Sequence, residues 1–447
     1  MATEAAPCAA GRSPAPHSAP TIALLTIGCK LNQAESEAMA FDLAAAGCQV
    51  TDQAVPADGY IINTCSVTHV ADRKSRHLIR LARRLSPRAP VIVAGCYVET
   101  AASDMLSMLG ADRAIVSAEK GSAVDFILQE AGTGCLPSPS STAARAAGRL
   151  RTRSFVKIQE GCNDACAFCI VPRSRGRERS VPAADLIDSL RSLEAGGVQE
   201  VVLTGTQLGA YGRDQGRPGA LVEFIASLLE STSFPRLRLS SLQPQDINQE
   251  LLDLWDDPRL CRHFHIALQS GSAAMLAGMR RRYTLDQFRE TLQAIRERLP
   301  DAAITTDILV GFPGETDAEL AETETFCREA GFAALHVFPY SRRPGTLAAA
   351  SRDQVPETAK RARVQRMLDL GQELRGRFLS RFEGRMMTVL WETTKQPAKN
   401  GAAALWEGLT DNYVRVLAAT DEMLENRLLP ARLVRRHGEG FWGELQL

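Results

Sequence analysis

The sequence predicts an α/β protein in three parts: a doubly wound parallel sheet, an array of strands and helices forming a barrel or partial barrel, and a small β-barrel. Short apolar runs alternate with helical segments over residues 21–130, and six further strand-like runs alternate with helices over residues 151–380. Over residues 381–447 the pattern changes to short strands with Gly and Asn turns. At 447 residues and 45% hydrophobic composition, the chain is long enough to form several cores.

The first part is expected to contain three strand–helix units. Its strand-like runs are Thr21 to Ile27, Tyr60 to Asn63 and Val91 to Ala94. Helical segments follow them over residues 35–46, 71–84 and 101–109. Repeated units of this length predict a parallel sheet with right-handed crossovers.

A cysteine follows each of these three strands. Cys29, Cys65 and Cys96 come directly after the runs in TIGC, INTC and VAGC. Because parallel strands bring their carboxyl ends to one edge, we expect the three thiols in one crevice, where open α/β sheets bind ligands. The alternative is that three small buried residues fall there by chance.

Two segments are expected to lie outside the folded domains. Residues 1–20 are rich in Ala, Pro and Ser and lack an apolar signal-peptide core, which predicts a disordered tail. Residues 131–150 are rich in Gly, Pro, Ser and Ala without periodicity, which predicts a linker. No run approaches the length of a membrane span, and eleven Cys without a secretory signal indicate a reducing compartment. We therefore expect a cytoplasmic protein without a membrane partner.

The second part, residues 151–380, is predicted to be a six-unit barrel or partial barrel. Its strand-like runs cover residues 155–159, 201–204, 237–240, 265–268, 304–310 and 334–338, with helical segments at 183–195, 221–229, 285–298 and 317–330. Active groups of such barrels gather at the carboxyl ends of the strands. Polar residues or glycines stand at those ends, and we take them as candidate site residues: Gly205, Thr206, Gln207, Ser240, Gln269, Gly311 and Glu315.

The loop after the first of these strands carries a second group of thiols. Cys162, Cys166 and Cys169 form C-x3-C-x2-C in IQEGCNDACAFC. Three thiolates within eight residues predict a shared soft metal centre, either an iron–sulfur cluster or zinc. A structural zinc site usually has four ligands, and no fourth Cys or His stands in this loop. An iron–sulfur cluster held by three thiolates would leave one iron open.

Charge and aromatic content give a weaker indication of the partner. Lys+Arg and Asp+Glu are both 52, but residues 71–88 carry seven Lys/Arg against one acid and residues 145–179 nine against three. Such stretches attract a polyanion, or they are solvated surfaces balanced by acids elsewhere. Three of the four Trp lie in the C-terminal part, where they either hold single-stranded RNA or form the core.

The string C-x3-C-x-aromatic-C, with Phe168 as the aromatic residue, resembles the loop of the radical S-adenosylmethionine (SAM) enzymes. That resemblance implies a (β/α)6 partial barrel in which Cys162, Cys166 and Cys169 are catalytic ligands of a [4Fe–4S] cluster. The open iron would bind SAM. Phe168 and the candidate residues at the strand ends would then contact this cofactor.

The longer string KIQEGCNDACAFCIVPRSRGRERS is similar to the methylthiotransferases within that superfamily. The resemblance extends to GCKLNQAESE, NTCSVTHVADRKSRHLIR and HVFPYSRRPGT, and it implies a second [4Fe–4S] cluster on Cys29, Cys65 and Cys96. It also implies a C-terminal TRAM-like RNA-binding domain. Substrate contacts would come from Arg73, Arg76, Tyr340, Arg342 and Arg343. The family usually has Glu where this chain has Gln243, which puts the contact of that position with SAM in doubt.

The resemblance is strongest to the branch that modifies N6-threonylcarbamoyladenosine at position 37 of tRNA. It implies methylthio transfer to C2 of that base, with two SAM molecules per turnover, tRNA as partner rather than DNA, and a low-potential electron donor. The same chemistry on isopentenyl-adenosine or on a ribosomal-protein side chain stays open. So does a non-enzymatic RNA-binding protein with structural zinc.

Overall fold

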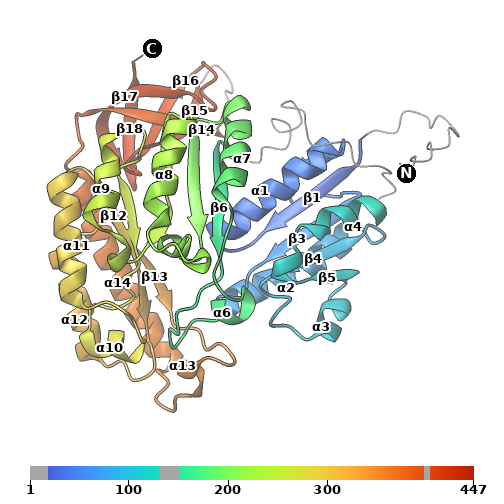
Figure 1. Cartoon of the computed structure of the whole chain (residues 1–447), viewed down its shortest axis with the longest axis horizontal. Helices are drawn as coiled ribbons and strands as arrows, with labels where there is room; N and C mark the ends of the chain where they lie inside the picture. Colours follow the sequence, from blue (N-terminus) through green and yellow to red (C-terminus); the bar gives the residue numbers. More distant parts are fainter. Residues whose placement is uncertain (1–18, 131–150, 397–402, 447) are drawn as a thin grey trace, which may run out of the picture.

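The computed structural model describes residues 19–130, 151–396 and 403–446, so the predicted linker and nearly all of the predicted tail lie outside the described residues. Figure 1 shows three bodies: an N-terminal sheet with its helices, a central array of strands and helices, and a C-terminal barrel. Among the described residues, no helix is long and apolar enough to cross a membrane.

The N-terminal body is a parallel sheet of five strands in the order β2-β1-β3-β4-β5, which confirms the doubly wound prediction. Helices α1 and α4 share one apolar core with the sheet, and α2 and α3 share the other. Two three-residue strands, β2 and β5, escaped prediction because they are too short to show periodicity. The strands are β1 (Thr21–Thr26), β2 (Gln49–Thr51), β3 (Gly59–Thr64), β4 (Val91–Gly95) and β5 (Arg113–Ile115); the helices are α1 (Lys30–Ala45), α2 (His69–Leu85), α3 (Ser103–Met108) and α4 (Ser122–Glu130).

The central body is a partial barrel made of two four-stranded sheets, β7-β6-β8-β9 and β10-β11-β12-β13. A bridge between Leu237 and Leu260 connects β9 to the segment before β11. The strands are β6 (Arg153–Glu160), β7 (Arg179–Ser180), β8 (Glu200–Gly205), β9 (Arg236–Leu239), β10 (Ser241–Leu242), β11 (His263–Ile266), β12 (Ala303–Val310) and β13 (Ala334–Pro339). All pairings within the two sheets are parallel except that of β7 with β6.

Helices cover the outside of this barrel and bury one large apolar core against it. They are α7 (Ala183–Ala195), α8 (Ala220–Ser231), α9 (Gln249–Asp253), α10 (Ala273–Gly278), α11 (Leu285–Arg298), α12 (Asp317–Ala330) and α14 (Glu357–Leu379), whereas the short helices α6 (Val171–Ser174) and α13 (Leu347–Ala350) lie in the segments that follow β6 and β13. The sequence marks several ends clearly. Thr284 and Thr316 form capping boxes at the starts of α11 and α12, and Gly331, with φ +56°, ends α12.

The C-terminal body is a closed barrel in the order β14-β15-β16-β18-β17. Its strands are β14 (Met386–Gln396), β15 (Ala404–Thr410), β16 (Arg415–Thr420), β17 (Leu428–His437) and β18 (Gly440–Leu445). Trp391 and Trp406 are buried in its core, so these two indoles stabilise the barrel. The third indole, Trp442, lies near the surface against His437.

Buried arginines dock this barrel onto the N-terminal ends of the central strands. Arg238 pairs with Glu200 at 2.7 Å, both fully buried, and donates to the backbone oxygen of Asp411 at 2.7 Å. Arg236 donates to the backbone oxygens of Leu409 and Thr388. The C-terminal barrel therefore covers the end of the central barrel opposite the loops that carry the predicted site.

Candidate functional site

The loop after β6 is shaped by Gly161, whose φ is +76°. A Cβ added there would lie 1.9 Å from the carbonyl oxygen of Arg177, so only glycine fits. The backbone N–H of Cys162 then donates to the carbonyl oxygen of Gly176 at 3.2 Å, and the N–H of Cys169 to that of Cys166 at 3.2 Å. These bonds fold the C-x3-C-x2-C segment into a compact loop.

Hydrogen-bond donors and burial act in opposite directions on the thiols of this loop. The N–H of Asp164 donates to the sulfur of Cys162 at 3.4 Å, and the guanidinium of Arg281 donates to the sulfur of Cys166 at 3.4 Å. Burial, together with the charges of the neighbouring thiols, raises the pKa of Cys162 to about 12 and that of Cys169 to about 11. The thiols are therefore neutral on their own, and binding iron would have to displace their protons.

The second set of thiols lies at the carboxyl edge of the N-terminal sheet, as the sequence predicts. Gly28, with φ +112°, brings the chain so close to Cys65 that an added Cβ would lie 2.6 Å from the Cβ of Cys65. Burial, together with the charges of Cys29 and Cys96, raises the pKa of Cys65 to about 12. Cys29 is exposed, whereas Cys65 and Cys96 are buried.

Neither set forms a site for a single ion. Within the described ranges, which include all six of these cysteines, no three His, Cys, Asp or Glu side chains lie close enough to hold one metal ion. In a cubane each cysteine binds a different iron atom, so three sulfurs at the corners need not meet at one point. The donor set of each triplet, three thiols without a carboxylate or imidazole among them, fits that kind of cluster.

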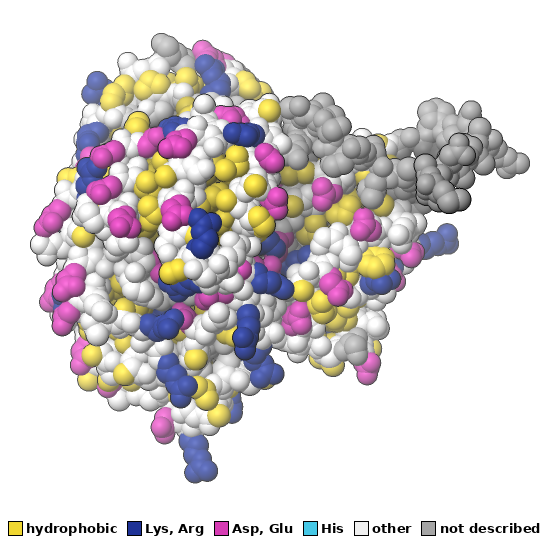
Figure 2. Space-filling view, in the orientation of Figure 1, with side chains coloured by type: hydrophobic (Ala, Val, Ile, Leu, Met, Phe, Trp, Pro, Cys, Tyr) yellow, Lys and Arg dark blue, Asp and Glu magenta, His cyan; other side chains and the backbone are white. Residues whose placement is uncertain are grey.

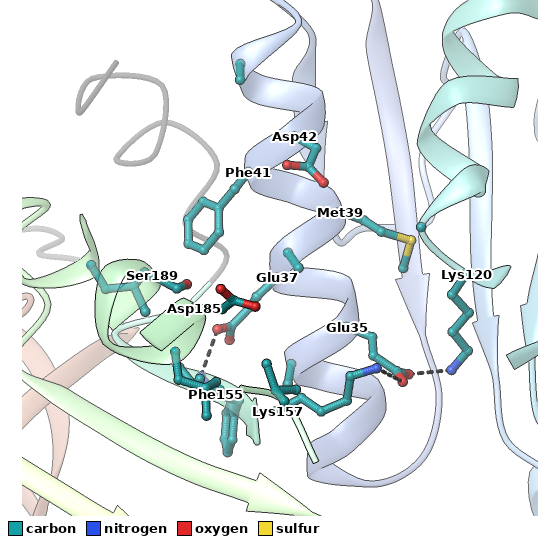
Figure 3. A pocket seen from close by; sticks show the side chains of 18 residues that line it. Glu35, Glu37, Met39, Phe41, Asp42, Lys120, Phe155, Lys157, Asp185 and Ser189 are labelled. Atoms are coloured by element: carbon teal, nitrogen blue, oxygen red, sulfur yellow. Dashed lines mark hydrogen bonds and ion pairs between the residues drawn. The ribbon is translucent and has the colours of Figure 1, made fainter. Parts of the chain in front are cut away.

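A buried network of charges lies between the segment that follows the cysteine loop and the N-terminal domain. Arg175, six residues after Cys169, donates to Glu35 of α1 at 2.9 Å and to Glu160 at 2.8 Å. Electrostatic interactions of Arg175 also reach Cys29 and Cys96. Glu35 further pairs with Lys120 and, at 3.1 Å, with Lys157, and Figure 3 shows its carboxylate between these two ammonium groups. Burial alone would raise the pKa of Glu35, but Lys120 and Arg175 outweigh it and lower the pKa to about 2.

The predicted cofactor residues at the strand ends fall into two groups. Thr206 accepts a hydrogen bond from the N–H of Gly161, and Gln207 lies 3.3 Å from the sulfur of Cys162, so both contact the cysteine loop. The amide nitrogen of Gln207 and the hydroxyl of Ser240 are buried without a partner among the described residues, which suits a polar ligand at this end of the barrel. Glu315 differs, because its carboxylate already accepts from the N–H of Gly311 and from Arg363.

The other predicted cofactor residues surround this end as well. Phe168 meets the ring of Phe312 edge to face, with 6.4 Å between centroids, in an apolar cluster that includes Met275, Met279 and Tyr340. Gly205 packs against Gln159, and Gln269 has φ +68° and pairs with Ile308 of β12. Gln243 donates to Asp164 at 3.2 Å, so it supports the cysteine loop.

The predicted substrate residues are not gathered in one place. Arg73 is exposed on α2, and Arg76 donates to the hydroxyl of Tyr97 at 3.2 Å. Tyr340 is buried, and Arg342 donates to the backbone oxygen of Ala349.

Arg343 is buried and bridges two domains. It pairs with Asp72 at 2.8 Å and donates to Ser66 at 2.9 Å. Its guanidinium holds the loop after β13 against the N-terminal domain and does not face the surface.

Three contacts near the cysteines lay outside the sequence prediction. Arg175, Arg281 and Glu35 reach the site from segments far apart in the chain, so no local spacing indicates them. The signals in the sequence were the arginine-rich string that follows Cys169, which contains Arg175, and the string GCKLNQAESE, which contains Glu35.

Comparisons with known proteins agree with this architecture. Residues 21–117 match the model of "Uncharacterized protein family UPF0004", and residues 156–327 match that of the radical SAM superfamily. The threonylcarbamoyladenosine tRNA methylthiotransferase MtaB of Bacillus subtilis (strain 168) is 35% identical over 426 residues, covering 93% of this chain and 94% of that protein. The tRNA-2-methylthio-N(6)-dimethylallyladenosine synthase of Sorangium cellulosum (strain So ce56) is 34% identical over 430 residues, covering 88% and 86%.

A solved structure shows the same fold. The radical S-adenosylmethionine methyltransferase TsrM from Kitasatospora setae, with tryptophan and a SAM analogue bound, superposes with a TM-score of 0.54 at 16% identity. The superposition covers 74% of this chain and 75% of that one.

Proposed function

Because the chain belongs to the radical SAM tRNA methylthiotransferases, we propose that it adds a methylthio group to C2 of N6-threonylcarbamoyladenosine at position 37 of tRNA. The observation that carries the proposal is the pair of cysteine triplets, with Arg175 of the chain just after the first triplet donating to Glu35 and interacting with Cys29 and Cys96 of the second. The choice of base is supported by three MtaB relatives at 33 to 35% identity. A dimethylallyladenosine synthase at 34% makes the dimethylallyl base the competing substrate.

Radical SAM chemistry requires a [4Fe–4S] cluster and SAM, and Cys162, Cys166 and Cys169 are the residues that would hold the cluster. Cys29, Cys65 and Cys96 would hold a second cluster. When bound, these groups supply the radical that activates C2, the inserted sulfur and the methyl group. The protein's own part is to fix both loops through Gly161 and Gly28, to donate from Arg281 to Cys166, and to exclude water with the apolar cluster around Phe312.

The partner is expected to approach over basic surface. Figure 2 shows Lys and Arg side chains gathered on the lower part of the visible face, where Figure 1 places α6 and α13. Arg173, Arg177 and Arg342 of this region are exposed. A second set of exposed cations, Arg73 and Lys74 among them, lies on α2. Both surfaces suit the phosphates of tRNA.

Metal analysis after anaerobic reconstitution tests the two clusters. The wild type is expected to bind about eight irons and as many sulfides per chain. Replacing Cys162, Cys166 and Cys169 by Ala together should leave about four, and so should replacing Cys29, Cys65 and Cys96. Zinc without sulfide would instead support a non-catalytic RNA-binding protein.

Nucleoside mass spectrometry tests the substrate. The gene is expressed in a host that makes both modified adenosines but lacks methylthiotransferases of its own. We expect the 2-methylthio derivative of threonylcarbamoyladenosine to appear, while dimethylallyladenosine stays unchanged. Methylthiolation of dimethylallyladenosine alone, or of a ribosomal-protein side chain, would refute the substrate while leaving the reaction class intact.

A further inference from the structure

A cavity of about 830 Å³ lies inside the open side of the central barrel, where that barrel meets α14 and the C-terminal barrel. Strands β6, β11, β12 and β13 and helix α14 all contribute to its wall. The volume is in the range of pockets that hold a nucleoside-sized ligand. One wall residue comes from the N-terminal domain: Lys30, the first residue of α1.

The ammonium of Lys30 has no hydrogen bond or ion pair with any residue in the described ranges, although its side chain retains only part of its surface. The other cations of the wall are engaged. Arg153 pairs with Glu392 at 2.5 Å, Arg415 lies 3.8 Å from Glu407, and Arg375 and Arg436 donate to backbone oxygens. An unpaired charge in a partly enclosed cavity is costly unless a ligand compensates it.

Three features of the neighbourhood favour an anionic ligand that also carries polar groups. The positive charges of Arg238 and Arg153 act on Lys30, and the charges of Tyr413 and Asp307 oppose them. Asp307 is already paired with His265 at 3.2 Å, so it does not neutralise Lys30 directly. His336 lines the same wall and can exchange hydrogen bonds with hydroxyl or amide groups, whereas the ring nitrogens of His265 are engaged with Thr305 and Asp307.

We propose that Lys30 binds the carboxylate of the threonylcarbamoyl group and thereby selects this base over adenosines with a neutral substituent. The proposal rests on the proposed function. The threonylcarbamoyl group brings a carboxylate, a hydroxyl and a urea next to the base, which match the lone ammonium and the polar wall. A dimethylallyl group brings only hydrocarbon and would leave Lys30 unpaired. Because Lys30 directly follows Cys29, its backbone also lies at the second set of thiols.

Binding of anticodon stem-loop RNAs to the anaerobically reconstituted enzyme tests this role. One RNA carries threonylcarbamoyladenosine at position 37, and the other carries its methyl ester, which lacks the negative charge and is larger by one methyl group. A charge-assisted contact predicts that the wild type binds the acid about tenfold to a hundredfold more tightly. Lys30→Met should abolish this preference, and Lys30→Arg should retain part of it. Lys74→Met, on the surface of α2, should weaken both RNAs equally.

The outcomes separate the two proposals. Equal binding of acid and ester by the wild type overturns the role of Lys30 whatever the variants do, and so does Lys30→Met with an unchanged preference. Iron content near that of the wild type shows that Lys30→Met keeps its clusters. A wild type that distinguishes the two RNAs but never methylthiolates the acid refutes the proposed function instead.

Discussion

Two glutamates on α1 are separated by one residue. Replacing one of them by glutamine is predicted to lower the stability of the protein, and replacing the other is predicted to raise it. Glu35 and Glu37 are both buried. Glu35 is ionised among three cations, whereas burial raises the pKa of Glu37 to about 8, offset only in part by the N–H of Phe155. Figure 3 shows both carboxylates where α1 lies along the barrel. Glu35→Gln should destabilise this interface, and Glu37→Gln should stabilise it at pH 8.

The magnitudes follow from the shifts. Folding lowers the pKa of Glu35 from 4.5 to about 2, so its stabilisation is present above pH 4.5 and is lost as the pH falls through 2. The shift corresponds to roughly 3 kcal/mol, and leaving buried cations unpaired costs roughly 3–5 kcal/mol. Glu37 has the opposite sign: its contribution is greatest below pH 4.5 and is lost as the pH rises to about 8. A neutral amide avoids that loss, on the order of 4 kcal/mol at pH 8.

Hydrogen exchange at pH 8, read by mass spectrometry on peptides of α1 and β6, measures these effects in the reconstituted enzyme. Because 1.4 kcal/mol is a factor of ten, Glu35→Gln should speed exchange about a hundredfold at the interface. Glu37→Gln should slow it. The reasoning is refuted if both variants shift exchange in the same direction, or if Glu35→Gln changes it less than threefold.

Three further predictions concern the thiol loop and the RNA surface. Gly161→Ala should block assembly of the cluster on the adjacent loop and lower the iron content to about four per chain. The control Gly176→Ala has a similar φ but open space around the added Cβ, so it should keep about eight irons. Equal iron content in the two variants would contradict the predicted clash at Gly161. Arg281→Met removes a charged hydrogen-bond donor from Cys166 and should lower the reduction potential of the cluster on that loop. The expected decrease is about 60 mV for each 1.4 kcal/mol of lost stabilisation of the reduced cluster, measured by redox titration followed by electron paramagnetic resonance. An unchanged potential would exclude the contact. Replacing Arg73 and Lys74 by Gln should weaken tRNA binding and reduce the slope of log K against log salt by about 0.9 for each lost phosphate contact; an unchanged slope would place the RNA elsewhere.

Much of the fold could be read from local signals. Helices α7, α11 and α12 run over the residues predicted to be helical, because the apolar stripe of a helix is a local pattern of a few turns. The three-residue strands β2 and β5 carry too little pattern to be recognised. For Trp391 and Trp406 the sequence allowed either a role in RNA binding or a place in the core. Both side chains are buried in the structure, so they belong to the core.

Some site residues could be placed from the sequence, and others could be placed only from the tertiary structure. The order of strands and thiols along the chain determined that Cys29, Cys65 and Cys96 share one sheet edge, because parallel topology leaves no other arrangement. Only the tertiary structure decided which charges are paired. Arg343 is predicted on the sequence as a substrate residue, yet it lies buried against Asp72, 271 residues away along the chain. Lys30, one residue from a predicted ligand, reaches into the barrel without a partner in the described residues. The cost of removing a charge from water depends on everything that surrounds it, and those surroundings come from distant segments that no local pattern specifies.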